Sequence, residues 1–364
     1  MFHWINWFRL YNTLGYNIFM TYIMTGIEGF ELTQQDIQNL NQPLTCGVIL
    51  FKRNYKDYHQ LVSLVKHIKA IKGQDFILAV DQEGGRVIRF GLPFTQLPPL
   101  GLIGQTYTKN KQAAKTLCHL HAWLMASELL SIGIDLSFAP VLDLDNGSDV
   151  IGDRAFSGDK NAVTELAELY GNSMQATGMK TTAKHYPGHG TVKADSHFEL
   201  PTDERPSAEL MNQDMYPFQQ LIPTGCIDAM MLSHVIYSQV CELPAGYSKK
   251  WHQEILREKQ NFNGVSISDD LGMKAAECVG DIEQRYQACI DADIDLTLVC
   301  EPQLCTELFS NNRLKYLPSD SKKLIKIKRL RGQSTLSTNQ PFWEQYRWQQ
   351  ARKALITLMN DINQ

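Results

Sequence analysis

Short runs of β-branched and apolar residues alternate with longer segments of helical periodicity over most of the chain, and this alternation constrains the fold more than any other feature. It is typical of parallel strands joined by crossover helices. Strands are predicted at 47–51, 76–80, 135–139, 179–183, 229–233, 264–268 and 294–299, with an eighth near 27–32. Helices are predicted at 55–71, 111–132, 162–177, 208–221, 249–259 and 282–292.

Titratable residues follow five consecutive predicted strands, and their positions distinguish between two folds that share this alternation. A closed barrel carries such residues at the carboxyl ends of several strands, whereas an open doubly wound sheet concentrates them at one or two switch-point loops. We therefore predict an α/β fold that consists of a single (β/α)8 TIM-type barrel. The residues concerned are Asp81, Asp143, Lys184, His185, His234 and Asp269.

Residues 24–364 contain no proline- or glycine-rich linker and no internal repeat, so we predict one catalytic barrel whose closing helices follow Cys300. A content of 43% hydrophobic and 20% charged residues is that of an ordinary soluble enzyme. Residues 1–23 are rich in aromatic side chains but lack the features of a signal peptide. We interpret them as an N-terminal extension of unknown role ahead of a start at Met20 or Met24, with an interfacial anchor as the alternative.

The charge balance gives no reason to expect a nucleic-acid or membrane partner. The net charge is −4, and the basic run at 322–331 is interleaved with Leu and Ile, so we interpret it as the solvated face of a helix. No segment approaches the roughly 20 apolar residues that span a bilayer. The eight cysteines are scattered without a C-x-x-C pair, which favours free thiols in a reducing cytoplasm.

The most specific segment is the loop sequence KHYPGHG at 184–190, which Asp195 and His197 follow closely. A carboxylate two residues from a histidine can orient the imidazole and favour its protonated form. Such a histidine can donate a proton to a leaving group and later take one from water. The spacing alone leaves two alternatives open: a metal site that also uses His185 and His189, or a purely structural loop.

A second segment, Ser268-Asp269-Asp270, follows an apolar strand directly. An aspartate at the end of a barrel strand can act as a nucleophile or hold a cation, and we assign this position to Asp269. We interpret its neighbour Asp270 as the N-cap of the following helix.

A third segment, DQEGGRVIR at 81–89, places Asp81 close to two arginines. It matches neither a dinucleotide loop nor a phosphate loop. A carboxylate with arginines nearby can grip sugar hydroxyls or form an internal ion pair, and Arg154 in IGDRAF has the same two interpretations.

Together these segments resemble glycoside hydrolase family 3, and most closely its compact bacterial β-N-acetylglucosaminidases of cell-wall recycling. The resemblance runs from about Ile27 to the closing helices. Residues 184–197 match the family element K-H-F/Y-P-G-H-G-x4-D-S-H at every fixed position. The 64 residues after Cys300 are too few for the second α/β domain of relatives that act on β-glucosides. One departure is Gly26, where the family pattern has an acidic residue.

The resemblance implies a retaining exo-β-N-acetylglucosaminidase, with Asp269 as nucleophile, His197 as acid/base and Asp195 as the partner of His197 on a mobile loop. It implies muropeptides that carry GlcNAc on anhydroMurNAc as substrates, in the cytoplasm of a Gram-negative bacterium, and no metal or other cofactor. We expect a monomer. The residues that would line the site for the terminal sugar are Asp81, Arg89, Arg154, Lys184 and His185.

Two alternatives belong to other functional classes. One is a metal-dependent hydrolase that uses His185, His189 and His197, which chelation would inactivate. The other is a sugar-binding barrel that has lost catalysis, which would bind without turnover.

Overall fold

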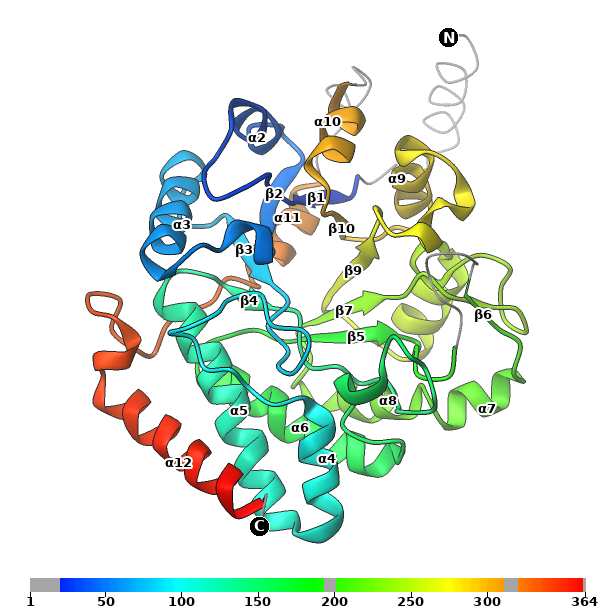
Figure 1. The fold of residues 1–364 in the computed structure, drawn as a ribbon. Coiled ribbons are helices and arrows are strands. Elements are labelled where there is room, and N and C mark those ends of the chain that lie inside the picture. Colours follow the sequence, from blue (N-terminus) through cyan, green and yellow to red (C-terminus); the bar gives the residue numbers. More distant parts are fainter. Residues whose placement is uncertain (1–19, 193–200, 311–319, 363–364) are drawn as a thin grey trace, which may run out of the picture.

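The computed structural model describes residues 20–192, 201–310 and 320–362, and eight parallel strands of this part form one sheet (Figure 1). The order in the sheet is β4-β3-β2-β1-β10-β9-β7-β5. Beyond β4, a parallel bridge from Val141 to Lys184 of β5 brings the two edges together, so the barrel is nearly closed and the predicted fold is confirmed. The strands are β1 (Tyr22–Thr25), β2 (Thr45–Leu50), β3 (Ile77–Val80), β4 (Leu136–Ser137), β5 (Thr182–Tyr186), β7 (Ala229–Leu232), β9 (Val265–Asp270) and β10 (Leu296–Val299).

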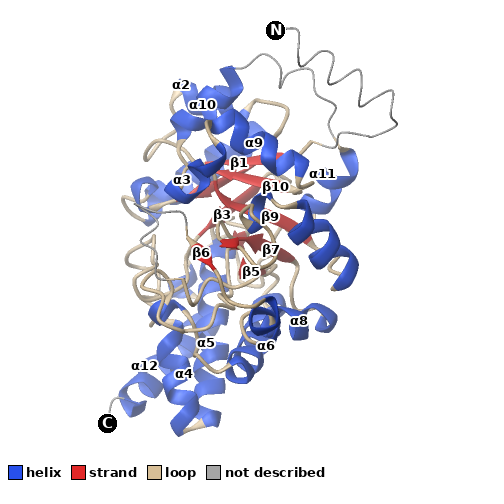
Figure 2. Ribbon diagram, turned by 90° about the vertical axis from the view of Figure 1, so that its right-hand side faces the viewer, coloured by secondary structure: helices blue, strands red, loops and turns tan. Residues whose placement is uncertain are grey.

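Helices surround the sheet, as Figure 2 shows, and several begin at the caps that their sequences predict. The side chains of Asp57 and Asp159 accept the N-terminal amide hydrogens of α3 and α6. The described helices are α2 (Gln34–Leu40), α3 (Tyr58–Lys72), α4 (Leu100–Lys109), α5 (Lys111–Ser131), α6 (Lys160–Ala176), α7 (Ser207–Asn212), α8 (Tyr216–Leu221), the π-helix η5 (Lys250–Lys259), α9 (Ile282–Asp291), α10 (Pro302–Ser310), α11 (Ser321–Lys328) and α12 (Tyr346–Ile362).

Two predicted elements differ from the structure. The eighth strand is β1 at Tyr22–Thr25, whereas the segment 27–32 is a loop, so the barrel wall includes residues ahead of Met24. All four residues of β1 are buried, so the strand lacks the alternation of polar and apolar residues that marks a half-exposed strand. The predicted helix 208–221 is divided into α7 and α8, and Pro217 lies in the first turn of α8, where proline favours a helix start. Residues 1–19 lie outside the described part of the chain.

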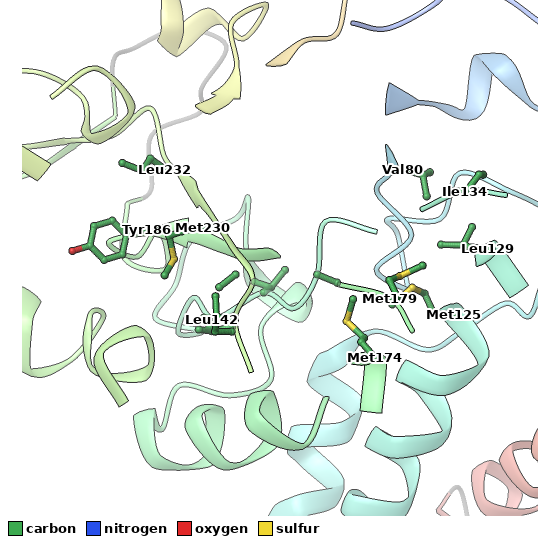
Figure 3. Packing of buried hydrophobic residues seen from close by; sticks show 14 of the residues in the cluster. Val80, Met125, Leu129, Ile134, Leu142, Met174, Met179, Tyr186, Met230 and Leu232 are labelled. Carbon is green, nitrogen blue, oxygen red and sulfur yellow. The ribbon is translucent and has the colours of Figure 1, made fainter. Parts of the chain in front are cut away.

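Two hydrophobic cores hold the barrel together. The larger core packs the outer face of the strands against the helices, and Figure 3 shows Met125 and Leu129 of α5 beside Met174 of α6. The smaller core fills the inside of the barrel. Because both faces of the strands are buried, they are apolar almost throughout, as in other parallel barrels. The interior core includes Met24, Ile49, Ile77, Phe138, Met231, Ile267 and Leu298.

Helix α11 closes the amino end of the barrel, and the predicted solvated face holds only in part: Lys322 and Lys328 are exposed, whereas Lys323 is buried. Ile327 joins the interior core, and the Nζ of Lys323 lies 2.6 Å from an oxygen of Asp293 in the turn before β10. Lys326 pairs with Asp295 at 2.6 Å. The predicted helix is present, but helical periodicity in the sequence does not show which lysines form ion pairs with carboxylates of another element.

None of the described helices is both long and apolar enough to cross a membrane. All eight cysteines lie in the described residues and are free, as predicted.

Candidate active site

The carboxyl end of the barrel brings the predicted strand-end residues together. Asp81 follows β3, Lys184 and His185 are part of β5, and Asp269 is the penultimate residue of β9. Arg154 ends a short 3-10 helix, η2 (Gly152–Arg154), in the loop after β4. The barrel topology therefore gathers residues that are up to 188 positions apart in the sequence.

Glu83 is the centre of an ion-pair network that the sequence analysis did not select. Lys184 Nζ lies 2.6 Å from Glu83 and 2.7 Å from Asp81. Arg154 donates two hydrogen bonds to the Glu83 carboxylate, at 2.8 and 2.9 Å. Burial raises the pKa of Glu83, but the charges of Lys184 and Arg154 more than offset it and lower this pKa to about 2. Glu83 is therefore an anion that holds two cations in place.

Asp81 and Arg89 are the more accessible members of this group. Arg89 Nη2 lies 3.6 Å from Asp81, and the two side chains are 28% and 18% exposed. The backbone N–H of Arg89 donates to the side chain of Gln82, which fixes the loop beside β3. Lys184, at 2% exposure, lies beneath them. Asp81 and Arg89 thus form an accessible layer that can contact a ligand, while the buried Lys184 beneath them pairs with the Asp81 carboxylate.

A bulge in β5 turns both Lys184 and His185 toward the site. Consecutive residues of a regular strand point to opposite faces, but the pairing of β5 with β7 shifts register between Lys184 and Tyr186. His185 has a φ of 139°, a backbone conformation that residues other than glycine rarely adopt. Its contacts with Asp143 and Arg154 stabilise this conformation.

Asp143 holds the His185 ring in one orientation. Asp143 is fully buried, and its carboxylate lies 2.5 Å from His185 Nδ1 and accepts the His189 backbone N–H at 2.8 Å. Arg154 Nη2 lies 3.3 Å from His185 Nε2. Because a guanidinium only donates, Nε2 must accept, so the imidazole proton belongs on Nδ1, facing Asp143. Burial raises the pKa of Asp143 and lowers that of His185, so the ring is neutral.

Among the described residues, only one oxygen of the Asp269 carboxylate has a hydrogen-bond partner. Its Oδ1 accepts the backbone N–H of Asp270 at 2.8 Å, and the side chain is partly exposed at the end of β9. Asp270 is not an N-cap, which corrects the prediction. Its Oδ1 accepts the N–H groups of Gly272 and Cys300, at 3.0 and 2.9 Å, and joins β9 to the end of β10. The following helix starts only after Met273.

The predicted acid/base pair, His197 and Asp195, lies outside the described residues, so those roles remain predictions. Among the residues that the structure does describe, no group of three or more His, Cys, Asp or Glu side chains is arranged to hold a metal. Both ring nitrogens of His185 already have protein partners, Asp143 and Arg154. His185 is therefore not available as a ligand in the metal-dependent alternative.

Glu83, Asp143 and His234 were not predicted as site residues. Asp143 and His234 follow strands as the selected residues do, so their positions were a usable signal. Glu83 lies within the segment 81–89, but the sequence does not show which of two carboxylates is buried.

Carboxylates and cations gathered at the carboxyl end of a (β/α)8 barrel are typical of the active sites of TIM-barrel enzymes, and this is the class to which the fold and the site point. The chain belongs to glycosyl hydrolase family 3, because the model of its N-terminal domain matches residues 21–329. A β-hexosaminidase of Tolumonas auensis is 47% identical over 278 residues, covering 76% of this chain and 82% of the relative. One of Actinobacillus pleuropneumoniae serotype 5b is 42% identical over 345 residues, covering 93% and 97%.

The structure of NagZ from Neisseria gonorrhoeae in complex with N-trifluoroacetyl-D-glucosamine is similar to this one, with a TM-score of 0.84 and 38% identity. The match covers 93% of this chain and 98% of that one. The predicted membership of family 3, the likeness to its compact β-hexosaminidases and the assignment to the glycoside hydrolases are therefore confirmed.

Proposed function

We propose that the protein is a retaining exo-β-N-acetylglucosaminidase that removes terminal β-linked GlcNAc from peptidoglycan fragments through a covalent glycosyl-enzyme intermediate. The observation that carries this proposal is the Asp269 carboxylate, one of whose oxygens has no hydrogen-bond partner in the described part of the chain, at the end of the barrel that also bears the Glu83 network. The NagZ structure, which holds N-trifluoroacetyl-D-glucosamine, supports a site for an N-acylated glucosamine.

In the proposed mechanism, the free oxygen of Asp269 attacks the anomeric carbon while His197 protonates the departing glycosidic oxygen. The glycosyl ester is then hydrolysed by water, whose proton returns to His197, and the configuration at the anomeric carbon is retained. Asp195 would orient His197. Once a histidine has donated its proton it is neutral, so it adds no negative charge beside an anionic muropeptide. Undiminished turnover by a His197→Glu variant would remove this rationale.

The sugar would contact the accessible layer of the network. Asp81 pairs with Lys184 at 2.7 Å, and its carboxylate can accept hydrogen bonds from two sugar hydroxyls. Arg89 can donate to the same ring. Arg154 and His185 are less exposed, and we assign them to the inner wall of the subsite.

The reaction and its nucleophile can be tested together with 4-nitrophenyl N-acetyl-β-D-glucosaminide in excess EDTA. We expect the native protein to release nitrophenol, and Asp269→Asn to reduce kcat by at least about 10³-fold, as expected when a nucleophile is removed. Asp75→Asn is the matched control, because Asp75 is an exposed partner of Arg331 in the loop before β3, at the amino end of the barrel. No turnover by the native protein, or loss of turnover in EDTA, would contradict the proposal.

We also propose a monomer located in the cytoplasm, with a carbohydrate and no nucleic acid or membrane as its partner. The eight free cysteines and the net charge of −4 support this part. Elution in gel filtration at the 41.4 kDa of one chain would agree with a monomer.

A further inference from the structure

His234 lies two residues beyond β7, beside the end of β9, and the proposed mechanism gives it no role. The residue is 2% exposed, and neither of its buried ring nitrogens has a hydrogen-bond partner among the described residues. A buried polar group without a partner destabilises the folded state, because it has lost its hydrogen bonds to water. A histidine that is retained in this condition needs a specific explanation.

The His234 ring is held firmly in its place. Tyr247 packs on it, with ring centroids 4.8 Å apart and planes tilted by 37°. On the same side is Gly246, where an added Cβ would lie 3.4 Å from two ring atoms. Gly246 donates its N–H to the carbonyl of Ser233 at 2.9 Å, which fixes this contact. Tyr247 and Gly246 therefore restrict the movement of the ring.

The register of β7 with β9 places His234 beside the nucleophile strand: Leu232 pairs with Ser268, so His234, two residues further on, lies alongside the Asp269–Asp270 end of β9. Burial lowers the pKa of His234, while the charge of Asp269 and the backbone of Asp269 and Asp270 oppose this shift without reversing it. The other charge that acts on the ring is Arg285 of α9, which lowers the pKa further. The imidazole is thus neutral at neutral pH and still carries one N–H donor.

The backbone next to this ring also determines the direction of the Asp269 carboxylate. The N–H of the Asp269–Asp270 peptide donates to Asp269 Oδ1, so that of the two oxygens only the other has no partner within the described ranges. We infer that His234 is a positioning residue, whose neutral N–H and flat ring support this peptide and so hold the free oxygen of Asp269 toward the anomeric carbon. The inference rests on the proposed role of Asp269 as nucleophile.

Three substitutions at His234 test the inference with the same nitrophenyl substrate. His234→Phe keeps a ring that packs on Tyr247 but removes the N–H. His234→Asn places an amide near the position of Nδ1, and His234→Gln places one near that of Nε2. We expect the phenylalanine variant to lower kcat about 10- to 100-fold, the effect of misplacing a reacting group by about 1 Å. KM should change less than about threefold, because Asp81 and Arg89 are unaffected.

One of the two amide variants should recover kcat about tenfold relative to the phenylalanine variant, and thereby identify which ring nitrogen lies toward the Asp269–Asp270 backbone. The acid limb of the pH profile of kcat/KM should shift in His234→Phe. It should return toward the native position in the amide variant that recovers kcat. If His234 only fills space, the acid limb of the kcat/KM profile should stay in its native position in His234→Phe, and the Asn and Gln variants should have the same kcat.

His252→Phe is the matched control for loss of a buried histidine. His252 is 1% exposed in the outer helix η5, where Nδ1 bonds the Ala292 carbonyl and Nε2 has no partner among the described residues. It should lower Tm and leave kcat unchanged. Native kcat in a folded His234→Phe, or equal kcat in the Asn and Gln variants, would overturn the inference. If the native protein fails to turn over the substrate, the proposed function is overturned instead.

Discussion

Glu83 neutralises two buried cations at once, so the charge of this one side chain affects both stability and binding. Replacing it by Gln keeps its shape and leaves Lys184 and Arg154 without their shared anion. Removing one partner of a buried ion pair costs about 3–5 kcal/mol, and we expect Glu83→Gln to lose this much in urea unfolding. The control is Glu277→Gln, which removes an exposed pair with Lys274 and should cause no measurable loss. Equal losses in the two variants would contradict this account.

Asp143 accepts from two donors, and an amide cannot replace it in both contacts. In Asp143→Asn the amide either donates to His185 and forces a proton onto Nε2, against Arg154, or turns its NH2 toward the His189 N–H. One contact is lost in either orientation. We expect kcat/KM to fall about tenfold, the effect of one hydrogen bond to a charged group, with the fold retained. The exposed Asp145→Asn is the control, and native kcat/KM in Asp143→Asn would refute the assigned tautomer.

At the scale of elements, helix α12 is fastened to the barrel by one buried hydrogen bond. Trp348 Nε1 donates to Glu128 of α5 at 2.7 Å, and Glu128 also accepts the backbone N–H of Thr95. We expect Trp348→Phe to reduce the free energy of unfolding, because it leaves the Glu128 carboxyl with one donor fewer.

The matched control for this substitution is Trp123→Phe in α5. Trp123 is also buried, but its Nε1 has no hydrogen-bond partner among the described residues. Both substitutions remove similar volume, so the difference between them isolates the hydrogen bond, which we expect to be about 1–3 kcal/mol in urea unfolding. Identical losses would show that α12 is held by apolar packing alone. Neither variant should change kcat.

The elements also show which features the sequence could predict. The alternation of strands and helices predicted the barrel, because that pattern depends on burial along the whole chain. The direction of His185 could not be predicted, since its positive φ is stabilised by Asp143, 42 positions away. The role of Asp270 was missed for a similar reason, because its partner Cys300 belongs to the end of another strand. The positions at strand ends thus identified candidate residues. Which of them are exposed to a ligand and which hold other residues in place depends on tertiary contacts, which the sequence does not show.

For the whole molecule, two buried glutamates act in opposite directions as the pH changes. The pKa of Glu83 is lowered to about 2, so its stabilisation is present above about 4.5 and is lost as the pH falls toward 2. Burial raises the pKa of Glu128 to about 7, although its hydrogen bonds oppose the shift. Its contribution is therefore fully present below about 4.5 and is lost as the pH rises through about 7.

The comparison of native protein with Glu128→Gln isolates the second effect. We expect the difference in unfolding free energy, native minus variant, to decrease between about pH 5 and 7.5, because only the native protein must keep a carboxyl protonated in its interior. Urea unfolding at several pH values measures it. A difference that stays constant over this range would show that Glu128 does not titrate there.

The pairing of β1 with β10 has a consequence for how the protein is made. Tyr22 lies in register with Leu296, so the wall of the barrel joins parts of the chain that are 274 positions apart and are synthesised at different times. Until β10 has emerged, β1 and β9 each expose an unpaired edge, and such edges are templates for aggregation. The nascent chain therefore keeps both edges until β10 at Leu296–Val299 has been translated, and a product truncated before residue 296 retains both edges.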